Sequence, residues 1–182
     1  MPLMRIAITG GIAEGKSTVL AYLDDLGYST ASGDLIARDV FHGAETQRRL
    51  SELLGVRIAV SPQSLRDRLS DPVIRRGANS IMHPAILAGI RAATATFVEV
   101  PLLVETCLQG EFDRIWVVSC GYREQLQRLT DREGNEVVAE ALIRTQLASR
   151  AKIPFADRLI RTNQPETSVK RLVTVAAQRE LR

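Results

Sequence analysis

A short glycine-rich run near the start of the sequence, from Gly10 to Ser17, has the residue types and spacing that bind phosphate groups. Gly10 and Gly15 are separated by four residues and followed by Lys16 and Ser17, which is the spacing of a nucleotide-phosphate loop. Glycines let successive N–H groups turn toward phosphate oxygens, the lysine reaches the β- and γ-phosphates, and the serine hydroxyl ligates Mg²⁺. We therefore predict an ATP and Mg²⁺ site formed by Gly10, Gly11, Ala13, Glu14, Gly15, Lys16, Ser17 and Thr18, with Lys16 catalytic.

Carboxylates near the expected ends of strands are the next candidates for chemistry. Asp34 follows a predicted strand, where a carboxylate can accept a proton from an attacking hydroxyl or hold a magnesium-bound water. A helix N-cap is an equally good interpretation of Asp34. Glu99 stands near the end of another strand and Glu105 follows shortly after it; each either supports Mg²⁺ or forms a structural salt bridge, and Glu99 is the candidate metal ligand.

Arginines gather in one part of the sequence, after the fourth expected strand. Arg128 and Arg132 are four residues apart and so share one face of a helix. Guanidinium groups placed in this way suit a mobile lid that closes over a transferring phosphate, which makes both residues candidates for catalysis. A solvated helix face is the competing interpretation. Arg123, Arg144 and Arg150 lie nearby in the sequence.

A phosphate loop needs a buried strand before it and a helix after it, and the sequence supplies both. Residues 5–9 form a β-branched run bounded by glycines, and apolar residues recur at helical spacing from Val19 to Leu26, with Gly27 as the C-terminal cap. Further strands are expected at residues 28–31, 96–100, 114–119 and 157–161. This alternation predicts an α/β fold, a P-loop NTPase-like parallel sheet with helices on both faces.

Two helical stretches interrupt the alternation of strands and helices. Residues 35–93 are poor in strand patterns and form the expected substrate-binding insert. Within it, Gly55 ends one helix, Asp71 caps another that begins with proline, and the proline after His83 interrupts a helical run. The second stretch, residues 122–150, is the expected helical lid.

The composition is that of an ordinary globular chain. Its 182 residues are 45% hydrophobic and 25% charged, which suits one domain, residues 1–182, with a substantial core. No run approaches the ~18 apolar residues of a membrane helix, and Arg5 interrupts the apolar stretch near the start, so neither a membrane segment nor a signal peptide is expected. Of the 24 basic residues 21 are arginine, but aromatic residues make up 4%, which does not favour nucleic acid as a partner.

Cysteine and histidine usage points to a reduced, cytoplasmic protein without a bound transition metal. Cys107 and Cys120 form neither a CxxC pair nor a secreted disulfide pattern, and we expect both to be buried and inert. His42 and His83 belong to no metal-binding motif. The sequence makes no prediction of the oligomeric state.

Taken together, these motifs resemble the dephospho-CoA kinase family. Besides the phosphate loop, the resemblance rests on Asp34-Leu35-Ile36-Ala37-Arg38, Ile81-Met82-His83-Pro84 and Val100-Pro101-Leu102-Leu103-Val104-Glu105. It continues in order over essentially the whole chain, through Gln125, Arg128, Arg132, Gln146, Ala156-Asp157 and Asn163. The resemblance implies transfer of the ATP γ-phosphoryl group to the ribose 3′-hydroxyl of dephospho-CoA, the last step of coenzyme A synthesis.

The resemblance also implies roles for individual residues. Asp34 becomes the candidate base, and the helix with Arg128 and Arg132 becomes a nucleotide lid. The residues that it implies for substrate binding are Asp34, Arg38, His83, Pro101 and Leu102, and Asn163 is implied in nucleotide binding.

The chain departs from the family pattern at several places. Ser32 stands where a second acidic residue is usual, and Ala13 and Glu14 replace a glycine and a small residue of the loop. We expect Ala13 to adopt a conventional backbone angle, whereas Glu14 either adds negative charge near phosphate or points to solvent. The stretch between Gly55 and His83 looks shortened. Two other functions therefore stay open: another small-molecule (nucleoside or nucleotide) kinase, or a degenerate, non-catalytic nucleotide-binding homologue.

Overall fold

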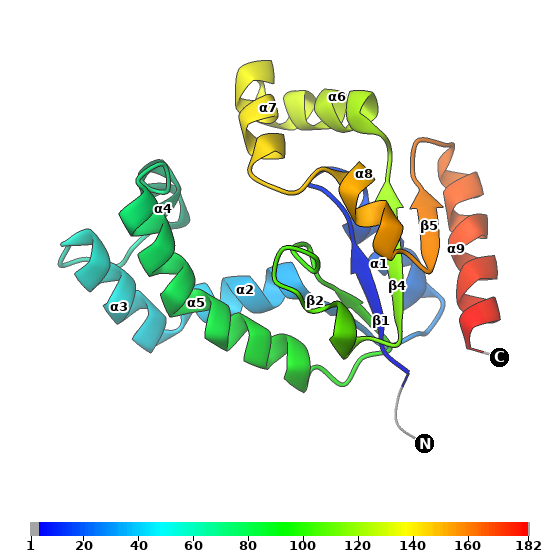
Figure 1. Cartoon of the computed structure of the whole chain (residues 1–182), viewed down its shortest axis with the longest axis horizontal. Coiled ribbons are helices and arrows are strands. Elements are labelled where there is room, and N and C mark those ends of the chain that lie inside the picture. The colour runs from blue at the N-terminus through cyan, green and yellow to red at the C-terminus, as the bar shows by residue number, and fades with distance from the viewer. Residues whose placement is uncertain (1–3, 182) are drawn as a thin grey trace. The chain divides into compact units, whose positions relative to one another are not determined.

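The computed structural model describes residues 4–181 (Figure 1). The chain divides into two compact units: residues 33–93 form the smaller, and the segments before and after them form the larger. Each unit has a hydrophobic core of its own.

The larger unit is built on a parallel sheet. Within residues 4–181 its strands are β1 (Ile6–Thr9), β2 (Thr30–Ser32), β3 (Phe97–Glu99), β4 (Arg114–Ser119) and β5 (Arg158–Arg161), in the spatial order β2-β3-β1-β4-β5. In the central strand, Ile8 pairs with Glu99 on one side and with Trp116 on the other. Every residue of β1 is buried, as expected for a strand covered on both faces. The chain switches from one half of the sheet to the other at β1, the place where such sheets bind ligands.

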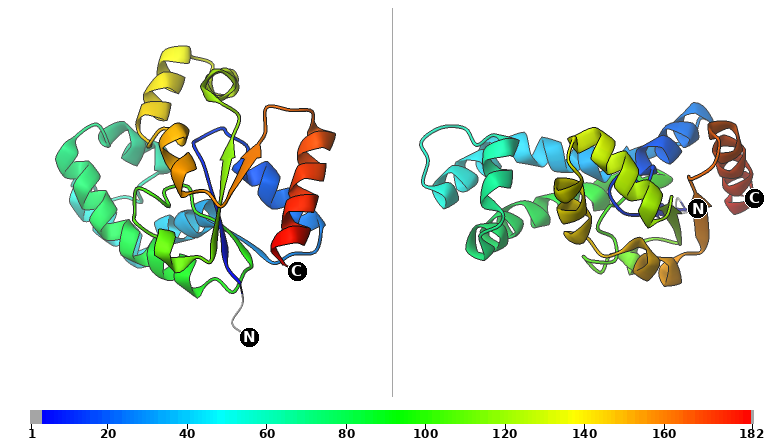
Figure 2. Two further views of the ribbon diagram at one scale, coloured as in Figure 1. Left: turned by 45° about the vertical axis from the view of Figure 1, so that its right-hand side comes forward. Right: turned by 90° about the horizontal axis from the view of Figure 1, so that it is seen from above.

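Helices cover both faces of this sheet, as the sequence predicts. On one face lie α1 (Lys16–Asp25) and α9 (Glu166–Glu180). Leu23 of α1 and Val173 of α9 share a core cluster with Phe97 and Trp116, whose rings meet edge to face with centroids 5.2 Å apart. Figures 1 and 2 show α8 (Ser149–Lys152) on the other face, in front of β4.

The chain between β4 and β5 rises above the carboxyl end of the sheet as two helices, α6 (Tyr122–Glu133) and α7 (Glu136–Arg144) (Figure 1). Gly134 ends α6 in the left-handed conformation, with a φ of 70°. Asn135 then caps α7, because its side chain accepts a hydrogen bond of 3.1 Å from the Val138 N–H. The chain continues through α8 and the 3₁₀ helix η2 (Ile153–Phe155) into β5.

The smaller unit is helical. Its helices are α2 (Gly33–His42), α3 (Ala44–Leu54), α4 (Pro62–Arg68) and α5 (Pro72–Ala92), around a core that includes Phe41, Leu50, Leu54, Leu65, Ile74 and Ile81. Gly55 ends α3 with a φ of 67°, as predicted. The predicted cap at Asp71 is also confirmed, since its side chain accepts a hydrogen bond of 2.7 Å from the Val73 N–H.

The expected interruption at His83 is wrong, because α5 continues through Pro84 to its end. Proline removes one backbone hydrogen bond, but close packing holds the helix on both sides of it. A Cβ on Gly77 would lie 2.6 Å from a methyl of Leu53 in α3, and one on Gly89 would lie 2.6 Å from a methyl of Ile36 in α2. Packing before and after the proline therefore outweighs the local bias against helix at the residue that precedes it.

A short 3₁₀ helix, η1 (Gln109–Glu111), lies in the connection from β3 to β4. Across residues 4–181, no helix is both long and apolar enough to cross a membrane.

Candidate active site

The glycine-rich run forms the predicted loop between β1 and α1. Gly10 has a φ of 153°, and a Cβ there would lie 2.3 Å from the carbonyl oxygen of Val118 in β4, so a side chain does not fit. Gly15, with a φ of 92°, turns the chain into α1. The N-cap residue, Gly15, has no side chain with which to cap this helix, so its N-terminus can face an external acceptor. Phosphate is the kind of ligand that a helix N-terminus of this form binds.

The residues that open α1 place an ammonium and two hydroxyls at this N-terminus. Lys16 is 8% exposed, and its Nζ donates a hydrogen bond of 2.9 Å to the carbonyl oxygen of Gly11. The ammonium group therefore lies against the backbone of the loop. Ser17 and Thr18 are exposed.

The two unusual residues of the loop do not behave as expected. Ala13 has a φ of 59°, in the left-handed region, so the expectation of a conventional angle is wrong. A residue with a Cβ pays roughly 1–2 kcal/mol of steric strain there. Glu14 is buried rather than solvent-facing: it accepts hydrogen bonds of 2.6 Å from the Gly11 N–H and 3.0 Å from the Ser119 hydroxyl. The inward orientation of Glu14 depends in part on Ser119 of β4, which the loop sequence does not contain.

Two glutamines, to which the residue patterns assigned no role, hold the loop at Ile12. Gln125 of α6 donates from Nε2 to the Ile12 carbonyl oxygen at 2.9 Å. Gln146, just after α7, accepts from the Ile12 N–H at 2.9 Å. These contacts join positions 113 and 134 residues apart, so no local pattern could reveal them. Their place in the family resemblance was the available signal.

Glu99 lies at the edge of the sheet where the loop begins. It is the last residue of β3 and 1% exposed, and it pairs with Ile8 of β1 and with Ser32 of β2. The Ser32 hydroxyl donates a hydrogen bond of 2.6 Å to Glu99 Oε2. Ser32, which stands where the family usually has an acidic residue, is therefore hydrogen-bonded to a carboxylate from the neighbouring strand.

Glu105 forms the structural salt bridge that was one of its two interpretations. Its Oε1 lies 2.8 Å from Nζ of Lys152, which is fully buried in α8, and it also accepts a hydrogen bond of 3.0 Å from the Leu147 N–H. Lys152 also donates to the carbonyl oxygen of Pro101 at 3.0 Å. The turn that contains Pro101 and Leu102, both half-buried, is thereby tied to the segment that follows α7.

The two lid arginines lie on α6, as predicted, but in different surroundings. Arg128 bonds Glu124 through Nε at 2.9 Å and donates from a terminal nitrogen to the Thr162 carbonyl oxygen at 2.8 Å. Arg132 is 55% exposed and pairs with the adjacent Glu133 at 2.9 Å. Arg128 thus connects α6 to the end of β5, whereas Arg132 is about half exposed and bonds its neighbour on α6.

Three of the predicted site residues belong to the smaller unit. Asp34 and Arg38 are exposed on α2, and His83 is half-buried on α5. Because α2 begins at Gly33, Asp34 lies inside the first turn of the helix rather than at its N-cap. The N-cap interpretation of Asp34 is therefore wrong.

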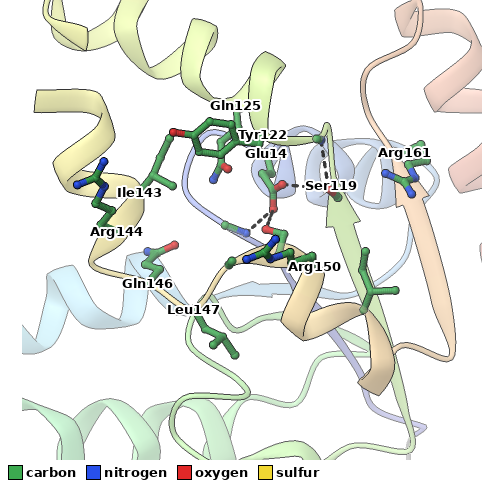
Figure 3. Close-up of a pocket in the computed structure, with 15 residues that line it drawn as sticks. Glu14, Ser119, Tyr122, Gln125, Ile143, Arg144, Gln146, Leu147, Arg150 and Arg161 are labelled. Carbon is green, nitrogen blue, oxygen red and sulfur yellow. Dashed lines mark hydrogen bonds between the residues drawn. The ribbon is translucent and has the colours of Figure 1, made fainter. Parts of the chain in front are cut away.

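A cavity of about 580 Å³ opens beside the loop, below α6 and α7 (Figure 3). Its lining includes Glu14, Gln125, Arg144, Gln146, Arg150 and Arg161. Arginine side chains suit phosphate ligands because their planar guanidinium groups bind oxyanions through two parallel hydrogen bonds. The predicted nucleotide residue Asn163 lines a neighbouring depression of about 470 Å³, together with Tyr122 and Arg123.

The cysteines differ from each other, although both were expected to be buried. Cys120 is buried, and its burial raises the thiol pKa to about 11, so it is inert at neutral pH. Cys107 is exposed, so that part of the expectation is wrong. It lies in the turn after β3 with a φ of 56°, in the left-handed region, and the next residue, Leu108, is buried.

The comparison with known proteins agrees with this geometry. A sequence profile of the dephospho-CoA kinase family matches residues 4–168. The chain belongs to the dephospho-CoA kinase family. A dephospho-CoA kinase from Fusobacterium nucleatum is 32% identical over 176 residues, covering 90% of this chain and 91% of that protein. One from Geobacter metallireducens is 35% identical over 176 residues, covering 87% of each.

A solved structure shares the fold over nearly the whole chain. The crystal structure of TT1252 from Thermus thermophilus superposes with a TM-score of 0.82 and 24% identity, covering 98% of each chain. Membership in the dephospho-CoA kinase family makes the chain an ATP-dependent phosphotransferase, and the fold supplies its phosphate loop at the central strand.

Proposed function

We propose that the chain transfers the γ-phosphoryl group of ATP to the ribose 3′-hydroxyl of dephospho-CoA, giving coenzyme A and ADP. The observation that carries this proposal is the loop between β1 and α1 in a member of this family: an uncapped helix N-terminus with Lys16 beside it. Phosphoryl transfer needs positioning and charge stabilisation rather than covalent chemistry by the protein, and these groups supply both.

On the nucleotide side, the loop backbone and the start of α1 bind the ATP phosphates. The residues that we propose for this task are Gly10, Gly11, Ala13, Glu14, Gly15, Lys16, Ser17, Thr18 and Asn163. Lys16 lies against the loop at Gly11, from where a rotation of its side chain brings Nζ to the β- and γ-phosphates. Arg128 and Arg132 stabilise the charge of the transferred group from α6.

Mg²⁺ fits the donor set at the sheet edge. Ser17 at the start of α1 and Glu99 at the end of β3 offer the oxygen ligands that this cation prefers. Bound there, Mg²⁺ would neutralise charge on the β- and γ-phosphates. Within residues 4–181, no group of three or more His, Cys, Asp and Glu side chains could hold a metal by itself. We therefore propose that Mg²⁺ enters with ATP, whose phosphates complete its coordination.

On the acceptor side, Asp34 is the proposed base. A ribose hydroxyl is a poor nucleophile, and an exposed carboxylate in the first turn of α2 can accept its proton. The residues that we propose for dephospho-CoA binding are Asp34, Arg38, His83, Pro101 and Leu102. Free thiols at Cys107 and Cys120 suit a reducing compartment, and we place the reaction in the cytoplasm.

The test is product formation. The purified protein is incubated with Mg-ATP and dephospho-CoA, and coenzyme A is detected by mass spectrometry, with a nucleoside and a nucleotide as alternative acceptors. We expect coenzyme A from the wild type, a loss of roughly 10²-fold or more in kcat for Lys16→Ala, and a loss of ~10²–10⁴-fold for Asp34→Asn with ATP binding retained. Phosphorylation of another acceptor alone would support a different small-molecule kinase. ATP binding without any phosphorylated product would indicate a non-catalytic homologue.

A further inference from the structure

Glu14 has an environment that binding of ATP by the loop backbone does not require. Its carboxylate is 1% exposed and lies where three parts of the larger unit meet (Figure 3). It accepts hydrogen bonds from the Gly11 N–H at 2.6 Å, from the Ser119 hydroxyl at 3.0 Å, and from the Ser149 hydroxyl. These donors belong to the loop itself, to the end of β4 and to the start of α8. One side chain therefore connects all three.

Because the Glu14 carboxylate is buried, its stability depends on these hydrogen bonds. A carboxylate removed from water is strongly destabilising unless hydrogen-bond donors replace the lost hydration. If Ser149 moved away, the carboxylate would lose one of its three hydrogen-bond donors. The cost of that loss favours the arrangement in which the start of α8 stays against the loop.

The chain just before α8 is hydrogen-bonded to the phosphate loop at a second point. Residues 146–149, which we call the lid-base segment, connect α7 to α8. At one end of it Gln146 accepts from the Ile12 N–H at 2.9 Å, and at the other Ser149 donates to Glu14. The lid-base segment is thus hydrogen-bonded to the phosphate loop at two positions, Ile12 and Glu14.

The lid-base segment lies between two of the arginines that line the cavity. Arg144 precedes it at the end of α7, and Arg150 follows it in α8. A displacement of the segment relative to the loop therefore displaces both guanidinium groups relative to phosphates bound in the loop. Misplacement by about 1 Å can cost on the order of 10²-fold in rate.

We propose that Glu14 is a positioning residue that couples the phosphate loop to the lid-base segment through Ser149, so that loop and lid arginines reach the reactive arrangement together. The proposal rests on the proposed function. It assigns Glu14 a role through its side chain, separate from the phosphate contacts of its backbone.

Two serines provide a matched test. Ser149→Ala and Ser119→Ala each remove one hydroxyl from the carboxylate, but Ser149 belongs to the lid-base segment, whereas Ser119 ends β4 and its Oγ also accepts a hydrogen bond of 3.2 Å from the Gly121 N–H. We expect Ser149→Ala and Glu14→Ala to lower kcat about 10-fold or more with KM for ATP changed less than threefold. Ser119→Ala should keep kcat within about twofold. Glu14→Gln should restore most of kcat, because its amide can accept from Gly11 and Ser149 and donate to Ser119.

A double variant separates coupling from simple destabilisation. If the two residues act as one connection, Ser149→Ala should have no further effect on kcat in a Glu14→Ala background. The proposal would be overturned if the kcat losses of Glu14→Ala and Ser149→Ala multiplied in the double variant. It would also be overturned if Ser149→Ala and Ser119→Ala lowered kcat equally.

Hydrogen–deuterium exchange gives a readout that does not depend on the reaction. Peptides covering residues 146–152 should exchange at least about threefold faster in Glu14→Ala and Ser149→Ala than in the wild type and Ser119→Ala. If the wild type makes no coenzyme A, the proposed function fails, and exchange alone decides whether Glu14 holds the lid-base segment. Unchanged exchange in Ser149→Ala would refute that connection.

Discussion

The buried ion pair between Glu105 and Lys152 leads to an asymmetric prediction for stability. Lys152 is fully buried, and its ammonium contacts Glu105 Oε1 at 2.8 Å and the Pro101 carbonyl oxygen at 3.0 Å. Glu105 has a side chain that is 22% exposed. Glu105→Ala leaves a buried charge with a single carbonyl partner, so we expect the free energy of unfolding to fall by about 3–5 kcal/mol. Lys152→Met removes the buried charge and leaves a carboxylate that water can reach. We therefore expect the free energy of unfolding to fall by only about 1–2 kcal/mol.

Urea unfolding of the single and double variants measures this asymmetry. The double variant should resemble Lys152→Met rather than Glu105→Ala, because the buried charge that penalises Glu105→Ala is gone. Asp25→Ala is the matched control: its pair with Lys170 spans 3.3 Å, both side chains are about half exposed, and its loss should cost less than about 1 kcal/mol. The reasoning is refuted if Lys152→Met is as destabilising as Glu105→Ala, or if the double variant is less stable than both.

Three further outcomes follow from the site. Ala13→Gly should raise the free energy of unfolding by up to about 1 kcal/mol, because glycine relieves the strain at a φ of 59° although it also favours the unfolded chain. A lower free energy of unfolding, measured with urea, would contradict this. Arg128→Ala should lower the free energy of unfolding by about 1–3 kcal/mol and Arg132→Ala by less than about 0.5 kcal/mol, since only Arg128 bonds the end of β5. Equal decreases for the two variants would argue against that contact. Iodoacetamide at pH 8 should label Cys107 and spare Cys120, whose raised pKa of about 11 leaves about 10⁻³ of the thiol as thiolate. Peptide mapping identifies the labelled residue, and labelling of Cys120 before Cys107 would contradict this prediction.

Features encoded by neighbouring residues were predictable from the sequence. The phosphate loop lies between β1 and α1 because the run from Gly10 to Ser17 carries both its conformational and its chemical requirements within a few residues. The same is true of the helix ends at Gly55 and Asp71, where the backbone freedom of one residue or the side chain of another satisfies nearby groups. The order of strands and helices, and hence the fold class, followed from such local signals.

Features decided by distant partners were not predictable in this way. The helix through Pro84 continues because two glycines allow close packing against neighbouring helices, and packing of this kind outweighs a local preference. Glu105 had two equal interpretations until the fold placed the buried Lys152 beside it.

The loop shows the division most clearly. The sequence predicted a phosphate site there, because spacing alone brings glycines, an ammonium and a hydroxyl to one helix N-terminus. The tertiary structure decided how the loop is held: Glu14 turns inward to Ser149, 135 residues away, and two glutamines bind Ile12 from α6 and from the end of α7. A buried carboxylate takes its orientation from whichever donors surround it, and those donors are brought together only when the whole sheet and its helices have formed.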